Sequence, residues 1–198
     1  MLTFFTLSLI GGLCLAEDAD KNTKKHGERE HETPILLPVN QRQIWHQKLH
    51  WQTGQCPLRS PFANDGGIAS YTLKGGNTLI VVACSLGVYQ GDSLLYAGDE
   101  KHGYGLLAFR QFRAYGNRKL VSYTDALLRG IVMVQPSQNS VEVLRKYRGL
   151  GNCGQLLRYR IEGGQAKLDE LRIKECDEVP GGVPPKAWRK VTLPREMP

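Results

Sequence analysis

The sequence predicts a mainly β protein, an antiparallel sandwich or barrel-like single domain with two disulfide-bracketed hairpins. Two observations lead to this prediction. Short runs of strand-forming residues recur through the chain, separated by clusters of Gly, Pro, Asn and Ser. Four cysteines flank two of the hairpins that these runs form. With 198 residues and 41% hydrophobic residues, the chain is long enough for one domain with its own core.

The predicted strands begin after residue 68. One hairpin joins Ala69–Lys74 to Thr78–Ser85 through two glycines and an asparagine, and another joins Leu156–Ile161 to Lys167–Glu175. Before them, Val39–Trp51 carries a partial helical stripe. Shorter strand candidates lie between the two hairpins: Ser93–Ala97, Leu106–Phe112, Leu120–Tyr123, Ile131–Val134 and Val141–Tyr147. Short strands at regular spacing are typical of sandwiches and barrels.

The N-terminal part of the chain predicts export. Residues 1–16 are apolar, carry no charge and end in small residues, as a signal peptide does, and they are too few to span a bilayer. Residues 17–38 form a predicted charged, disordered linker, within which Pro34–Pro38 is the entry to the fold. Residues 39–195 form the β-domain. We therefore expect a periplasmic or secreted protein with no transmembrane segment after signal cleavage.

Removal of the signal peptide leaves four cysteines, Cys56, Cys84, Cys153 and Cys176. An even number of cysteines in an exported chain favours disulfides over free thiols or zinc. Three pairings are possible. We predict Cys56–Cys84 and Cys153–Cys176, because each pair brackets one hairpin. The chain has no C-x-x-C motif, so a zinc ribbon or a thioredoxin-like site has no support, and both bridges are predicted to be structural.

A glycine motif lies near the end of the basic part of the sequence. Gly149, Gly151 and Gly154 have the spacing of a dinucleotide fingerprint, which requires a helix directly afterwards. Here Leu156–Ile161 follows with the period of a strand, and Gly163 and Gly164 end it. The sequence therefore predicts a tight structural turn and no dinucleotide.

The formal net charge of +7 points to an anionic partner. Ten Lys or Arg lie between residues 110 and 160, opposed only by Asp125 and Glu142. We predict a basic face that binds a polyanion or an envelope component. The alternative is a solvated strand face in a basic protein. Tyr159, within this stretch, is either a stacking surface or a core residue. The predicted anion-binding residues are Arg145, Lys146, Arg148, Arg158 and Arg160.

No catalytic constellation stands out in the sequence. His46 and His50 are four residues apart, but the glutamate of a zinc protease helix is missing, and His102 is isolated. We predict no catalytic residue, no metal and no cofactor. The favoured function is a non-enzymatic exported binding protein. The alternatives are an envelope hydrolase with an unrecognised site, or an inhibitor of a host enzyme such as lysozyme.

Three segments resemble the bacterial domain-of-unknown-function 1176 family. They are Val82–Gln90 around Cys84, the Arg-Gly-Leu-Gly-Asn-Cys-Gly run at 148–154, and the span from Cys176 to Trp188, and they are preceded by the pair Trp51 and Cys56. The likeness covers about residues 41–190. Asn152 replaces the family's usual acidic residue, and the family's N-terminal cysteine pair is missing, so the chain looks like a shortened member. The resemblance implies an exported, disulfide-bonded bacterial protein and supplies no activity.

Overall fold

The computed structural model describes residues 33–115, 119–149, 151–176 and 183–193. These residues are mostly in antiparallel strands, as the sequence predicts, and the path of strands does not close into a barrel. The predicted signal peptide and the linker up to residue 32 lie outside the described residues. Within the described ranges there is one α-helix, α1 (Arg42–Leu49), which follows a short 3-10 turn, η1 (Val39–Gln41), in the stretch predicted to be helical.

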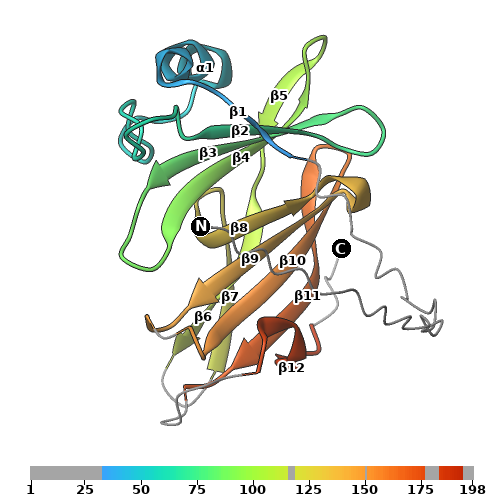
Figure 1. The fold of residues 1–198 in the computed structure, drawn as a ribbon. Coiled ribbons are helices and arrows are strands. Elements are labelled where there is room, and N and C mark those ends of the chain that lie inside the picture. The colour runs from blue at the N-terminus through green and yellow to red at the C-terminus, as the bar shows by residue number, and fades with distance from the viewer. Residues whose placement is uncertain (1–32, 116–118, 150, 177–182, 194–198) are drawn as a thin grey trace, which may run out of the picture. The chain divides into compact units, whose positions relative to one another are not determined.

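The first part of the sheet runs in the order β1-β2-β3-β4, with β5 on the other edge of β4 (Figure 1). Strand β1 enters the sheet by pairing with β2, within the segment predicted to be linker. This pairing agrees with an entry to the fold between Pro34 and Pro38. The strands are β1 (Ile35–Leu36), β2 (Ile68–Thr72), β3 (Thr78–Ser85), β4 (Gly91–Asp99) and β5 (Gly103–Leu106).

The second part of the sheet runs in the order β8-β9-β10-β11-β12. A separate hairpin of β6 and β7 forms its own two-stranded sheet. These strands are β6 (Phe109–Tyr115), β7 (Lys119–Asp125), β8 (Leu128–Gln135), β9 (Ser140–Lys146), β10 (Gly154–Glu162), β11 (Gln165–Lys174) and β12 (Arg189–Lys190). Two more 3-10 turns are η3 (Pro136–Gln138) and η4 (Pro185–Ala187).

Strand β8 connects the two parts of the sheet. Its first three residues pair with Gly91–Ser93 of β4, and the rest of the strand pairs with β9. The change of partner follows Gly130, whose φ is +145°. A Cβ on this residue would lie 2.8 Å from the carbonyl oxygen of Leu144, so a larger side chain does not fit at the bend.

The expected strand Leu106–Phe112 is wrong in one respect, because the chain leaves the sheet in its middle. Strand β5 ends at Leu106 and β6 begins at Phe109. Between them, Leu107 is buried and its N–H donates to the carbonyl of Leu95 at 2.9 Å. This anchor turns the chain from the main sheet into the β6–β7 hairpin. Strand periodicity alone does not mark such a change of sheet.

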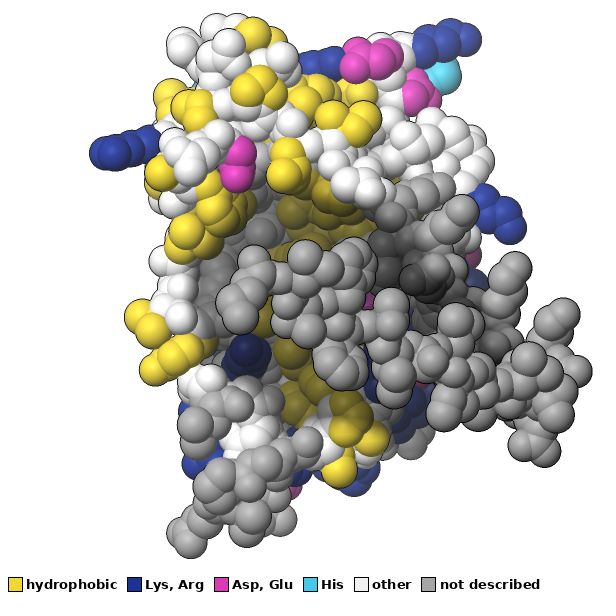
Figure 2. Space-filling view, viewed as in Figure 1, with side chains coloured by type: hydrophobic (Ala, Val, Ile, Leu, Met, Phe, Trp, Pro, Cys, Tyr) yellow, Lys and Arg dark blue, Asp and Glu magenta, His cyan; other side chains and the backbone are white. Residues whose placement is uncertain are grey.

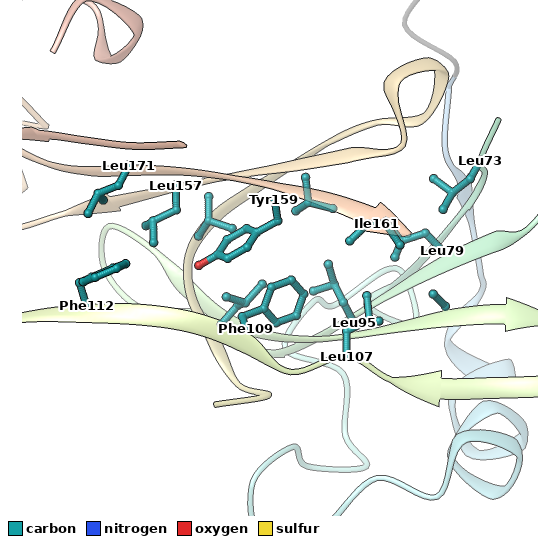
Figure 3. Packing of buried hydrophobic residues seen from close by; sticks show 14 of the residues in the cluster. Leu73, Leu79, Leu95, Leu107, Phe109, Phe112, Leu157, Tyr159, Ile161 and Leu171 are labelled. Atoms are coloured by element: carbon teal, nitrogen blue, oxygen red, sulfur yellow. The ribbon is translucent and has the colours of Figure 1, made fainter. Parts of the chain in front are cut away.

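The larger core lies between β6, one face of β3 and β4, and the inner face of the second part of the sheet (Figure 3). Leu157, Tyr159 and Ile161 alternate along β10 and point into it. The Tyr159 ring meets Phe109 edge-to-face, with centroids 5.0 Å apart, and its hydroxyl donates to the Arg110 carbonyl at 2.9 Å. Tyr159 is fully buried, which raises the pKa of its hydroxyl. The structure thus selects the core alternative for Tyr159 over the stacking surface.

The smaller core lies on the other face of β3 and β4, beneath α1 and the loop that follows it. Ile80, Val82 and Leu94 contribute to it. Both predicted disulfides are confirmed. Cys56–Cys84 joins this loop to β3 and brackets the β2–β3 hairpin, and Cys153–Cys176 brackets the β10–β11 hairpin.

Candidate functional site

The five basic residues proposed for anion binding lie on different faces of the sheet. Arg158 and Arg160 project from the outer face of β10, as the period of a strand requires. Arg145 has the opposite orientation on β9, and its guanidinium donates to the Phe112 carbonyl of the β6–β7 hairpin at 3.1 Å. Lys146 ends β9, and Arg148 donates to Asn152 at 3.0 Å within the turn that follows. The fold brings together two of the five and distributes the others.

The two arginines that share the outer face are both paired with carboxylates. Arg158 holds Glu142, which is 2% exposed, through Nε at 2.9 Å and Nη2 at 2.5 Å. Arg160 binds Asp169 at 2.7 Å and Glu162 at 3.2 Å. Asp169 and Glu162 lie beyond the basic stretch of the sequence. Counting charges along the chain therefore overstated the free positive charge on this face.

The glycine motif forms a turn and a strand start, as predicted. The Gly151 N–H donates to the Arg148 carbonyl at 3.1 Å, and β10 begins at Gly154 where a nucleotide fold would begin a helix. Gly149 packs against Tyr89, because a Cβ there would lie 2.4 Å from two atoms of the tyrosine ring. The described part of this turn therefore has a packing role.

The histidines occupy separate places in the fold. His46 lies on α1 with Nε2 3.0 Å from the Trp51 carbonyl oxygen, whereas His50 follows the helix with a φ of 54°. His102 pairs with Asp99 at 2.9 Å and lowers the pKa of that carboxyl. Within residues 33–115, 119–149, 151–176 and 183–193, no three His, Cys, Asp or Glu side chains gather as metal ligands. The helices of these ranges are too short or too polar to cross a bilayer.

The main cavity candidate, called the β8 cleft below, lies beside β8 and extends over the outer faces of β9 and β10. It has a volume of about 750 Å³. Figure 2 shows hydrophobic side chains in a recess on this face of the molecule. Its lining residues come from six segments: Thr33 and Pro34; Tyr71 of β2; Val132, Met133, Val134 and Gln135 of β8; Glu142 and Leu144 of β9; Leu156 of β10; and Pro184, Pro185 and Lys186.

The walls of the β8 cleft are mostly apolar because the sheet carries hydrophobic residues on both faces here. Register places Met133 opposite Glu142 and Leu144 opposite Leu156 on the outer face. In a sheet with one solvated face, these positions would be polar. Met133 is 38% exposed, so its side chain is partly open to a ligand. Sequence reasoning did not identify these cleft residues.

The rim of the β8 cleft towards β12 is basic. Arg172 lies opposite both the cleft residue Leu156 and Lys190 of β12. Arg172 and Lys190 share one carboxylate, Glu170, and Lys190 binds it at 3.3 Å. Burial alone would raise the pKa of Glu170, but hydrogen bonds from Arg172 and Lys190 hold it below its usual value. Lys186, also in the lining, forms no ion pair with a described residue. These groups leave net positive charge at the rim.

Comparisons with known proteins give no relative for this chain. No protein-family model, curated protein or solved structure matches it. The resemblance of the Arg148–Gly154 segment to the domain-of-unknown-function 1176 family stays a prediction. The geometry of the β8 cleft is therefore the basis for proposing a function.

Proposed function

We propose that this is an exported, non-enzymatic binding protein, periplasmic or secreted, whose β8 cleft holds a ligand with an apolar body and an anionic group. The observation that carries the proposal is the cleft itself. Its volume of about 750 Å³ lies within the range of roughly 300–1,000 Å³ that is usual for ligand sites. The two disulfides are compatible with an exported protein.

The chemistry of the lining supports binding in preference to acid–base catalysis. Glu142 is the one carboxylate among the lining residues named above, and Arg158 holds it in an ion pair. Apolar surface from Met133, Leu144 and Leu156 dominates the outer side. Such surface binds through removal of apolar area from water, and the cation of Lys186 at its border selects for a negative charge on the ligand.

Anilinonaphthalene sulfonate, a dye with apolar rings and one sulfonate, is the first probe. We expect the folded protein to bind it with enhanced fluorescence, and Met133→Asp to abolish most of that binding by placing a like charge in the apolar wall. Lys186→Glu should weaken binding about fivefold, from the ~1 kcal/mol upper value of an exposed ion pair. Fluorescence titration measures both effects.

Two matched variants test whether the dye reports on the β8 cleft. Val121→Asp places the same charge on an exposed hydrophobic residue of β7, and Lys101→Glu reverses an exposed lysine near β5. Both should bind the dye like the parent protein, with unchanged circular dichroism. If Val121→Asp and Met133→Asp lost equal amounts of dye binding, the β8 cleft would not be the site at which the dye binds.

Binding of an anionic macromolecule through the basic residues is a second candidate, favoured by the net charge of +7. We expect any such binding to be weak, because Arg158 and Arg160 are already paired with carboxylates. Heparin affinity at increasing salt measures it. A steep salt dependence that Arg160→Gln reduces, with Lys101→Gln as the control, would support a basic face. Retention that is insensitive to salt would contradict it.

A further inference from the structure

The β8 cleft follows the edge of a strand as well as a face of the sheet. Four consecutive residues of β8, from Val132 to Gln135, line it. Side chains of a strand alternate between its two faces, and those of Val132 and Val134 pack against the larger core. A cavity on one face alone would be lined by every second residue. What Val132 and Val134 present to the cleft is therefore largely their main chain.

The hydrogen-bond pattern of β9 shows which way the main chain of β8 points. Arg160 of β10 lies directly opposite Ser140 of β9. The Ile161 N–H donates to the Asn139 carbonyl at 2.7 Å, and this bond joins the residue after Arg160 to the residue before Ser140. In an antiparallel ladder, a hydrogen bond between the neighbours of two opposite residues identifies those two residues as a non-hydrogen-bonded pair. Both members of such a pair point their own N–H and C=O away from each other. Ser140, and with it every second residue of β9, therefore points its main chain at β8.

The main-chain groups of Val132 and Val134 consequently point away from β9. Ser140 and Glu142 lie opposite Gln135 and Met133, so these odd-numbered residues of β8 exchange the bonds with β9. The alternate residues direct their N–H and C=O to the side of the cleft. In the part of the chain that the structure describes, Val132 and Val134 have no hydrogen-bond partner on that side.

The open edge has a defined length, because other segments pair with β8 at both ends. Gly130 lies opposite Gly91 of β4. At the other end, the Lys74 N–H donates to the Pro136 carbonyl at 3.2 Å. The gap from Gly130 to Pro136 covers six residue steps, about 20 Å at 3.3 Å per residue. A single extended segment of four or five residues fits this length.

We infer that the ligand of the β8 cleft is an extended peptide that adds to β8 as a strand and bonds to Val132 and Val134. This inference rests on the proposed function, that the cleft is a ligand site. An acyl chain would fill the apolar walls but leave four main-chain groups unpaired, whereas a peptide strand supplies matching donors and acceptors. Alternate side chains of the peptide would meet Tyr71 on one side and the basic outer rim with Lys186 on the other. Apolar and acidic residues in alternation fit these two surroundings.

The test uses a fluorescent pentapeptide of alternating valine and glutamate, measured by anisotropy with the full-length protein. We expect saturable binding that anilinonaphthalene sulfonate competes away. Val134→Pro removes the N–H that points into the cleft and leaves the bonds to β9 intact, so it should weaken binding at least tenfold. Val134→Ala, the matched control, keeps the N–H and should bind within about threefold of the parent protein.

A second arm changes the peptide, so that the test does not depend on folding of the proline variant. The same peptide with N-methylated valines lacks the donors for one edge and should not bind. Equal binding of the methylated peptide, or of Val134→Pro, would overturn pairing with β8. Dye binding without peptide binding would overturn the peptide inference and leave the proposed function standing. Loss of both would overturn both.

Discussion

Replacement of Arg42 by methionine is expected to lower the free energy of unfolding by about 4 kcal/mol, roughly 1 kcal/mol for each of four carbonyls left without a donor. Arg42 is 2% exposed. Its Nε donates to the Leu58 carbonyl, Nη1 to that of Gly66, and Nη2 to those of Pro57 and Ala83, at 2.7–2.9 Å. No regular secondary structure satisfies the loop carbonyls at 57, 58 and 66.

The guanidinium of Arg42 holds the loop that follows α1 in place by binding its carbonyl groups. Its Cζ lies 5.4 Å from the centre of the Trp51 ring, and burial lowers its pKa. It forms no ion pair within the described residues, so backbone carbonyl dipoles and the face of the Trp51 ring compensate its charge. A planar group with five donors can bind four carbonyls in different directions, which an ammonium cannot do.

Urea denaturation monitored by tryptophan fluorescence measures the effect of Arg42→Met. Arg59→Met, in the same loop but exposed, is the matched control and should change the stability by less than about 0.5 kcal/mol. Arg42→Lys keeps the charge and should recover only a minor part of the loss. A stability of Arg42→Met equal to that of the Arg59 variant would show that water replaces the guanidinium at no cost.

Loss of the Cys56–Cys84 disulfide is the second large effect that we expect. The bridge closes a loop with a sequence separation of 28, for which restriction of the unfolded chain corresponds to about 3.6 kcal/mol. Cys56 and Cys84 are 0% and 3% exposed within the smaller core. The double variant Cys56→Ala and Cys84→Ala should therefore lose this amount and a further contribution from lost sulfur packing.

The second disulfide serves as the matched comparison. Cys153–Cys176 has a similar sequence separation of 23, so the stabilisation that it gives by restricting the unfolded chain is nearly the same, about 3.4 kcal/mol. Cys176, however, is exposed, and its removal costs less packing. In urea denaturation, the Cys153→Ala and Cys176→Ala variant should be the more stable of the two double variants. The reverse order would mean that the bridge at β10–β11 has a larger role than its burial indicates.

Much of the β structure could be predicted because strands and turns are local properties. Thr78–Ser85 is predicted with the bounds that β3 has, and the double-glycine turns after Lys74 and Glu162 end their strands as expected. The disulfide pairing followed from the hairpins, since a hairpin brings its two ends together. The prediction of no dinucleotide rests on the same kind of local evidence, the strand period of Leu156–Ile161.

The candidate site could be predicted only in part, because charge along the sequence does not show which groups share a face. Arg160 pairs with Asp169 across a hairpin, and Arg145 points to the opposite side from Arg158. The cleft had one local signal, the run Ile131–Val134, which is apolar at every position. Such a run indicates a strand covered on both faces. It does not show that one edge is open.

The sequence by itself determined most of the strands, the hairpin turns, the two disulfide pairs and the net charge of this protein. Each of these depends on residues that are near in sequence or on composition alone. Only the tertiary structure decided that Tyr159 is a core residue, that Arg158 neutralises Glu142, and that β8 leaves β4 after Gly130. These depend on strand order and register, which bring distant residues together. The β8 cleft, with the open edge at Val132 and Val134, exists because one strand divides its hydrogen bonds between two neighbours.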